Sequence, residues 1–248
     1  MVEHLVYTER VGGSSPSPPT KARAALLGAL ALLLALAGLG LSPQAARASA
    51  SAMTFRLAHL ESVSCRKHCP GVIVADGVIE EGTPQAFADF IAGASVEPNL
   101  RAVVFMDSPG GQVVASMKLG ALFRKLHVVG IVGRIETING REGPVAGSCV
   151  SACIYAFMGA LKRIIPPESR VATHRMSATE KTFAQVFFGG PGNQRFADRD
   201  MVDALARYAA SMGVSTALVR EAESHSPDEI HVLSGVELRR WRLETSAS

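Results

Sequence analysis

From residue 51 onward, short strand-like apolar runs alternate with longer helical patterns, and this alternation limits the chain to an α/β architecture. The strand-like runs are 55–60, 72–80, 102–106, 128–132, 163–165 and 171–174. Helical patterns lie between and after them, over 83–92, 113–126, 150–159, 197–212 and 215–224. Strands joined through helices of about ten residues or more pair in parallel, with right-handed crossovers. The sequence therefore predicts a largely parallel sheet covered by helices.

Composition agrees with a globular protein, since 48% of the 248 residues are hydrophobic and 19% are charged. These values exclude a disordered, collagen-like or coiled-coil chain. No internal repeat or low-complexity linker follows residue 50, so we expect residues 51–248 to form one domain. Two Gly-rich segments, 133–147 and 189–192, are predicted to be surface loops.

Residues 1–50 have the pattern of an export segment. Lys21 and Arg23 precede an uncharged run over 24–41 that contains only Ala, Leu and Gly. A Ser-Pro break follows, and then Ala46-Arg47-Ala48 or Ala48-Ser49-Ala50 offers a small-x-small site for a signal peptidase. The run is also near the lower length limit for spanning a bilayer. We therefore expect residues 1–50 to be a signal peptide or an N-terminal membrane anchor, which would place the domain in a bacterial periplasm.

The net charge of +3 argues against nucleic acid as a partner. Residues 1–48 contain four basic and two acidic residues, which leaves a net charge of +1 for the remainder. Binding to phosphate backbones needs clustered Lys and Arg, and a nearly neutral domain does not supply them.

Export also bears on the four cysteines, because an oxidising compartment permits disulfides. Cys65 and Cys69 lie in a polar, turn-like segment and are candidates for a local bridge. A zinc site that uses them with His68 is the alternative, although their spacing is not that of a usual zinc knuckle. Cys149 and Cys153 are four residues apart on a predicted helix, and we expect two small buried side chains there.

Three segments place small or reactive residues where a strand ends or a helix begins. The strand 102–106 runs into a Ser-Pro-Gly-Gly turn at 108–111, whose backbone N–H groups could bind an oxyanion. Ser151 stands at the start of an apolar helix, where the helix dipole favours negative charge. His174 ends a short strand. Taken singly, each also fits a structural role as a turn, an N-cap or a packed histidine.

Taken together and in this order, the segments resemble the proteolytic subunit of the Clp protease and its relatives in the crotonase-like fold. The matching blocks are Ser108-Pro109-Gly110-Gly111, Val150-Ser151-Ala152-Cys153 and the segment 167–174. The resemblance covers about residues 70–240 and looks closest to an exported branch with Cys-x-Ser-Ala-Cys around the serine. It implies an α/β spiral of ββα units with C-terminal helices.

The resemblance also implies roles for particular residues. Ser151 would be the nucleophile and His174 the general base, while Gly110, Gly111 and Ala152 would supply the oxyanion-hole N–H groups. No metal and no cofactor are expected.

The third member of the catalytic triad is the point at which the family pattern fits less well. In the family an Asp shortly precedes a helix that begins Ser-x-x-Glu, and 233–238 resembles that helix start. With the family spacing, counting back from Ser234 leads to Ile230, and counting forward from the helix end at Met212-Gly213 leads to Ser226. We choose Asp228, which lies between them. A Ser-Lys dyad, as in the related signal peptide peptidases, is a second choice with Lys162 or Lys181.

The sequence thus predicts an exported serine hydrolase acting as a peptidase on peptide or protein substrates, and the resemblance implies a homo-oligomer. A recognisable loop for docking an unfoldase is missing, so we expect action without a cytosolic ATPase. Two alternatives stay open. One is an inactive Clp-like scaffold that binds an envelope protein or peptide. The other is acyl-thioester chemistry, which a periplasmic location disfavours.

Overall fold

The computed structural model describes residues 51–60, 71–94, 100–180, 193–226 and 229–245. Several predictions fall outside these ranges: the export segment, Cys65 with His68 and Cys69, Lys181, the 189–192 loop and Asp228. Within the ranges, none of the helices combines the length and the apolar character that crossing a membrane requires.

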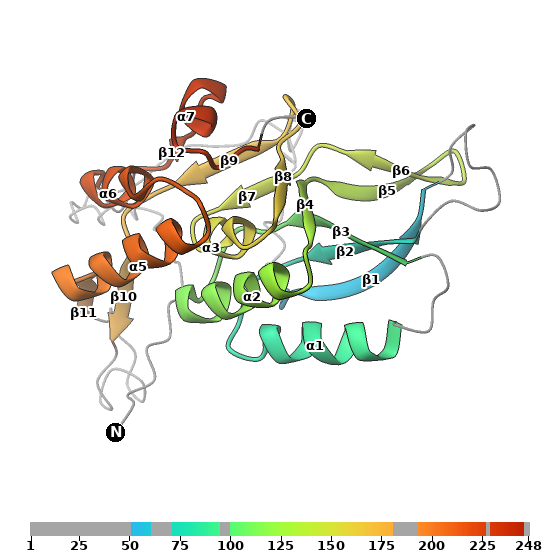
Figure 1. Ribbon diagram of the computed structural model, residues 1–248, viewed down its shortest axis with the longest axis horizontal. Helices are drawn as coiled ribbons and strands as arrows, with labels where there is room; N and C mark the ends of the chain where they lie inside the picture. Colours follow the sequence, from blue (N-terminus) through green and yellow to red (C-terminus); the bar gives the residue numbers. More distant parts are fainter. Residues whose placement is uncertain (1–50, 61–70, 95–99, 181–192, 227–228, 246–248) are drawn as a thin grey trace, which may run out of the picture. The chain divides into compact units, whose positions relative to one another are not determined.

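A five-stranded sheet forms the centre of the domain (Figure 1). Its order is β1 (Thr54–His59), β2 (Gly71–Asp76), β3 (Leu100–Asp107), β4 (Val129–Val132) and β8 (Lys162–Ile164). β1 is antiparallel to β2, and all the other neighbours are parallel. Every residue of β2 except Asp76 is buried, as expected of a strand inside a covered parallel sheet. The predicted α/β class is confirmed.

Two helices, α1 (Thr83–Ala94) and α2 (Val113–Lys125), run below this sheet in Figure 1. Their apolar faces carry Phe87 and Phe123, whose rings meet edge to face at 5.1 Å. Phe55 of β1 lies 5.1 Å from Phe87 on the other side. Burying each such side chain contributes about 1.5–3 kcal/mol, so this aromatic row fastens both helices to the sheet.

A smaller sheet of β7 (Ser148–Val150), β9 (Arg170–Thr173) and β12 (His231–Val232) adjoins the first. Ser108, just after β3, pairs with Cys149 of β7, so the backbone of the large sheet continues into the small one. The hydroxyl of Ser108 is buried and donates to the carbonyl of Gly77 at 2.7 Å. The end of β3 is therefore held in place on two sides.

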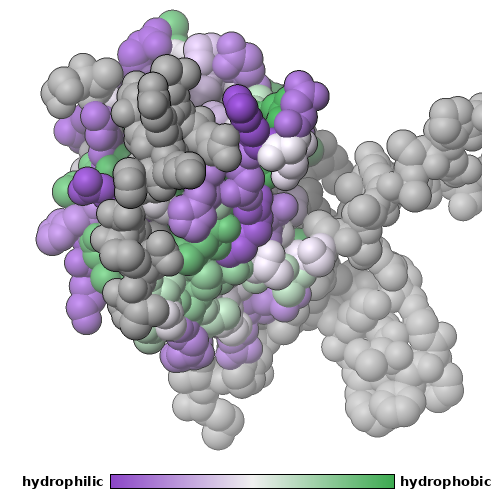
Figure 2. All heavy atoms as spheres, turned by 90° about the vertical axis from the view of Figure 1, so that its right-hand side faces the viewer, coloured by the Kyte–Doolittle hydropathy of each residue, from purple (hydrophilic) through white to green (hydrophobic). Residues whose placement is uncertain are grey.

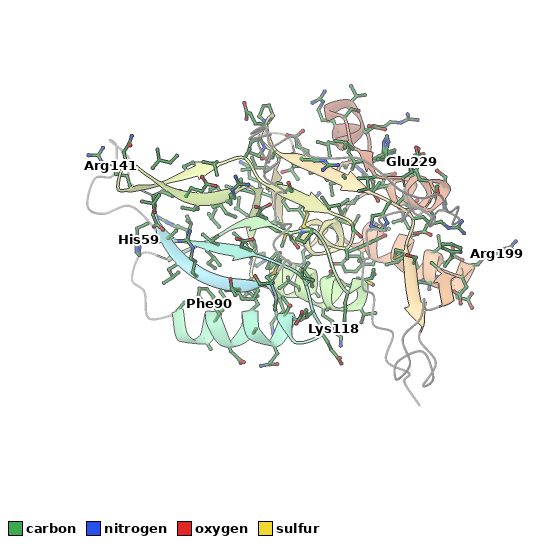
Figure 3. The ribbon with its side chains drawn as sticks, turned by 180° about the vertical axis from the view of Figure 1, so that it is seen from behind. His59, Phe90, Lys118, Arg141, Arg199 and Glu229 are labelled. Atoms are coloured by element: carbon green, nitrogen blue, oxygen red, sulfur yellow. A yellow bond between two sulfur atoms is a disulfide. The ribbon has the colours of Figure 1, made fainter. Side chains whose placement is uncertain are left out.

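The segment 133–147 is a β-hairpin, and its prediction as a loop is wrong. β5 (Arg134–Ile138) and β6 (Arg141–Val145) pair across Asn139 and Gly140, which both have positive φ. Asn-Gly is a strong two-residue hairpin turn, because both residues accept the left-handed conformation. Arg141 marks the tip of the hairpin in Figure 3. The described surface at this end is largely hydrophilic, with hydrophobic residues gathered lower in the view (Figure 2).

The predicted helix over 150–159 is shorter, because β7 extends to Val150 and α3 spans only Cys153–Met158. The helix cannot include Ser151, whose φ of 56° lies in the left-handed region. Two further sheets have two antiparallel strands each. β5 pairs with β6, and β10 (Ser177–Glu180) pairs with β11 (Asn193–Phe196).

The C-terminal helices are α5 (Arg199–Ser211), α6 (Thr216–Ser224) and α7 (Gly235–Arg240). Each begins at a side-chain cap, with Asp198, Ser215 and Ser234 accepting backbone N–H groups. The hydroxyl of Tyr208 on α5 donates to the carbonyl of Tyr155 on α3 at 2.8 Å. This bond ties the C-terminal helices to the helix that follows Ser151.

Candidate active site

Ser151 occupies a sharp turn between β7 and α3. Its φ of 56° is unusual for a residue with a Cβ and costs about 1–2 kcal/mol. Its backbone N–H donates to the carbonyl of Ala172 on β9 at 2.9 Å, which holds the turn against the neighbouring strand. A strained turn between a strand and a helix lifts a serine side chain out of the backbone path, as it does at the nucleophile of the α/β-hydrolases. The Ser151 side chain is half-buried.

A disulfide joins Cys149 to Cys153 across this turn. Both residues are fully buried, as predicted, but the expectation of two unbridged side chains on one helix is wrong. Cys149 lies on β7 and Cys153 begins α3, so the turn at Ser151 brings their Cα atoms to 5.3 Å. That separation is typical of disulfides. The bridge therefore closes a short loop around the serine.

The Gly110-Gly111 turn lies against Ser151. Both glycines have φ values, 110° and 139°, that a residue with a Cβ rarely adopts. A Cβ added at Gly110 would stand 2.9 Å from the Ser151 Cβ and 2.8 Å from the Val150 carbonyl oxygen. Only glycine allows the turn to approach the serine this closely.

Two backbone N–H groups are available to a ligand, one directly after Ser151 and one in the Gly110-Gly111 turn. Among the residues that the structure describes, neither Gly111 nor Ala152 donates its N–H to a protein acceptor. The Gly110 N–H is engaged, because it donates to the Ser108 Oγ at 3.2 Å. Of the three predicted oxyanion donors, Gly111 and Ala152 thus retain a free amide.

His174 directly follows β9, the parallel neighbour of β7, so it leaves the small sheet at the same end as Ser151. Its Nδ1 lies 2.8 Å from the carbonyl oxygen of Arg175. A carbonyl oxygen can only accept, so this hydrogen bond requires the proton on Nδ1 and leaves the Nε2 lone pair free. Nε2 is buried and has no hydrogen-bond partner. This is the tautomer that a general base needs, and no hydrogen bond joins Nε2 to Ser151 in the described chain.

Glu223 is a buried carboxylate near His174 that the sequence reasoning missed. It lies on α6 with its side chain 11% exposed, and its Oε1 accepts the N–H of Met176 at 3.2 Å. Its Oε2 lies 3.9 Å from Nε of Arg175. Burial raises the pKa of the Glu223 carboxyl, while the Met176 N–H and the charges of Arg175 and His174 act in the opposite direction. A signal was present, because Glu223 stands four residues after Val219 on the apolar face of the helix.

A small pocket opens beside Ser151 between α3, β9 and α6. Its lining is mostly apolar: Ser151, Ile154, Tyr155, Met158, Thr173, Leu218, Val219 and Ala222. Lys162, the alternative base, lies on β8 at the edge of the large sheet and does not line this pocket. Within the described residues no cluster of His, Cys, Asp or Glu has the geometry to hold a metal ion.

The chain is similar in fold to solved structures of Clp-protease-like proteins. A serine-to-alanine mutant of the 1510-N membrane-bound stomatin-specific protease matches with 18% identity and a TM-score of 0.47, over 67% of this chain and 73% of that one. A lysine-to-alanine mutant of that protease, in complex with a substrate peptide, matches with the same identity and TM-score, over 70% and 71%.

A third similar structure is an asparagine-to-aspartate mutant of ClpP1 from Listeria monocytogenes. It matches with 15% identity and a TM-score of 0.42, over 67% of this chain and 84% of that one. A scan against protein-family models and a search of curated proteins each found no match. With identities of 15–18% and TM-scores below 0.5, these matches are a partial likeness and assign no role to any residue of this chain.

Proposed function

We propose that the chain is a serine hydrolase that cleaves peptide bonds, with Ser151 as nucleophile and His174 as general base. The observation that carries the proposal is that three features occur at the neighbouring ends of β7 and β9 and in the glycine turn beside them. These are a serine lifted by a left-handed backbone, two free amides at Gly111 and Ala152, and a histidine whose Nε2 lone pair is unpartnered.

The reaction follows from these positions. Nε2 of His174 takes the proton of the Ser151 hydroxyl as Oγ attacks the carbonyl carbon of the substrate. The Gly111 and Ala152 N–H groups donate to the oxyanion of the tetrahedral intermediate. As that intermediate collapses, the imidazolium gives its proton to the leaving amine. Water activated by Nε2 then releases the acyl group from Oγ.

The pocket beside Ser151 has room for about one water molecule, so it does not by itself select a substrate side chain.

The remaining parts of the proposal rest on the sequence. Export through residues 1–50, as a cleaved signal or as an anchor through 24–41, would bring the domain to the periplasm. The Cys149–Cys153 disulfide supports that compartment, since disulfides persist where the surroundings are oxidising. Assembly into a homo-oligomer rests on the resemblance to Clp-protease-like proteins.

The second candidate is an inactive scaffold that binds an envelope protein or peptide. The observation that favours it is the missing hydrogen bond between Ser151 Oγ and His174 Nε2 in the described chain. In hydrolases without substrate this contact is often long, so its length does not exclude catalysis.

Labelling with a fluorophosphonate, which reacts only with activated serines, separates the two candidates. We expect purified residues 51–248 to be labelled at pH 7.5, and we expect Ser151→Ala and His174→Ala to abolish labelling while they keep the thermal unfolding midpoint. If the folded wild-type protein is not labelled while a control hydrolase is, the scaffold becomes the better description. Labelled protein would then be assayed on peptides with apolar or charged residues before the cleaved bond.

A further inference from the structure

Glu223 and His174 contact opposite sides of one peptide group. The N–H of Met176 donates to Glu223 Oε1 at 3.2 Å, and the carbonyl of Arg175 accepts from His174 Nδ1 at 2.8 Å. That N–H and that carbonyl belong to the same planar peptide unit. The chain of contacts therefore runs from a carboxylate, through a peptide group, to the imidazole.

Such a chain has an electrostatic consequence. A carboxylate that accepts from the N–H end of a peptide polarises the group and makes its carbonyl a stronger acceptor, since bonded dipoles reinforce one another. A stronger acceptor at Nδ1 fixes the neutral tautomer and stabilises the imidazolium that forms when Nε2 takes a proton. The carboxylate thus acts on the base without touching it.

The side chain of Glu223 is largely buried although it carries an ionisable carboxyl group. Burial is the largest influence on its carboxyl and raises the pKa, so the ionised form is less favourable in the folded protein than in water. Its surroundings include Arg175 and His174 after β9, and the buried Tyr155 on α3. A charge held at a cost beside a candidate base is typical of functional sites.

We propose that Glu223 is the positioning residue of His174 and acts through the 175–176 peptide group, in the role that the sequence assigned to Asp228. The inference rests on the proposed function. It differs from a directly bonded Ser-His-Asp triad because the acceptor at Nδ1 is a backbone carbonyl and the carboxylate lies one peptide group further away.

The test compares labelling rates of the wild type with Glu223→Gln, which keeps a hydrogen-bond acceptor for Met176 and removes the charge. Glu221→Gln is the matched control, because it lies on the same helix with its side chain 44% exposed. Asp228→Asn tests the competing assignment. We expect Glu223→Gln to lower the labelling rate at least about tenfold at pH 7.5, part of the 100- to 10,000-fold that a positioned base supplies. The Glu221→Gln control should match the wild type, whereas a comparable fall in Asp228→Asn alone would support the competing assignment.

The pH dependence separates a charge effect from a structural one. Only the ionised carboxylate can polarise the peptide, so the ratio of wild-type to Glu223→Gln rates should be largest above the raised pKa of Glu223. It should shrink toward one as the pH falls through that pKa. A ratio that stays constant with pH would reduce Glu223 to a structural residue and overturn the inference.

A second measurement decides the inference even if no labelling occurs. In Ser151→Ala protein, the ¹⁵N shifts of the His174 ring report which nitrogen carries the proton. We expect the Nδ1–H tautomer with Glu223 and a mixture of tautomers with Glu223→Gln. Unchanged shifts, or loss of labelling in Asp228→Asn alone, would refute the role of Glu223 and leave the proposed function standing. An unlabelled wild type would count against the proposed function instead.

Discussion

The two sides of the candidate site, named the nucleophile side and the base side after the roles proposed for Ser151 and His174, are built in different ways. On the nucleophile side, Ser151 is enclosed within five consecutive residues by the disulfide between Cys149 and Cys153. On the base side, His174 is oriented by the backbone of the next residue, and that backbone is held by Glu223 on a helix 47 residues away from Met176. One side is fixed by local covalent structure and the other by long-range packing.

This difference indicates which kind of perturbation should damage each side. The nucleophile side has backbone strain at Ser151 and two glycines in conformations that residues with a Cβ rarely adopt, so it depends on close packing and on the closed loop. The base side stores the cost of a buried charge, so it depends on electrostatics and on pH. Perturbations of packing should therefore damage the serine, and perturbations of charge should damage the histidine.

The largest expected effect comes from Gly110→Ala, which tests packing on the nucleophile side. The added Cβ would press on the Ser151 Cβ and the Val150 carbonyl, displacing the serine from the free amides. Loss of one oxyanion donor costs about 100- to 1,000-fold, so we expect labelling to fall at least about 100-fold.

Gly140→Ala in the hairpin turn is the matched control for Gly110→Ala. Gly140 also has positive φ, at 77°, but a Cβ there would meet nothing within 4 Å. Gly140→Ala introduces the same kind of backbone strain but does not touch the site, so its labelling rate should equal that of the wild type. Equal rates for the two variants would show that the turn at Gly110 does not hold the serine.

A smaller effect is expected from removing the disulfide with Cys149→Ala and Cys153→Ala together. A bridge at a sequence separation of 4 is worth about 2 kcal/mol of unfolding free energy on the chain-entropy model. We expect the urea midpoint to fall accordingly and labelling to slow, because the strained turn at Ser151 loses its closure.

Reducing the Cys149–Cys153 disulfide in the wild type is a second test of the nucleophile side. Treating the wild type with dithiothreitol under partly unfolding conditions should give the urea midpoint and labelling rate of the double variant. In the double variant, dithiothreitol can act only through Cys65 and Cys69. A double variant with unchanged stability and unchanged labelling would mean that packing alone, without the disulfide, holds the turn at Ser151.

The smallest effect is expected from a substitution in α7, the helix that follows β12. Glu237 accepts from the backbone N–H and hydroxyl of Ser234 at the helix start, and these bonds lower its pKa to about 2. A depressed pKa stabilises the folded state above the ordinary value of about 4.5, and the contribution is lost as the pH falls toward 2. Glu237→Gln should therefore cost about 1 kcal/mol or less at pH 7 and almost nothing near pH 2.

Thermal unfolding at several pH values checks this prediction, with Glu229→Gln as the control because its side chain is 62% exposed. Labelling by Glu237→Gln should stay at the wild-type rate. A slower labelling rate of Glu237→Gln at unchanged stability would mean that the base side of the site includes α7.

Local sequence signals predicted much of the fold. Alternating apolar runs located every strand of the large sheet, and the predicted helices 113–126 and 215–224 differ from α2 and α6 by one residue at one end. The polar, Gly-rich composition of 133–147 predicted a loop, whereas the Asn139-Gly140 turn within it joins two paired strands. The bridge between Cys149 and Cys153 was missed because a continuous helix was assumed through Ser151.

By itself, the sequence determined the order of the three blocks and hence the residues that could act as nucleophile, base and oxyanion donors. These signals are local, since turns, caps and strand ends depend on neighbours along the chain. Only the tertiary structure decided which amides stay free, how the His174 ring is oriented and that Glu223 approaches it. Such facts depend on which faces of distant elements meet, and packing of α6 against β9 and α3 is set by the whole core rather than by residues near His174.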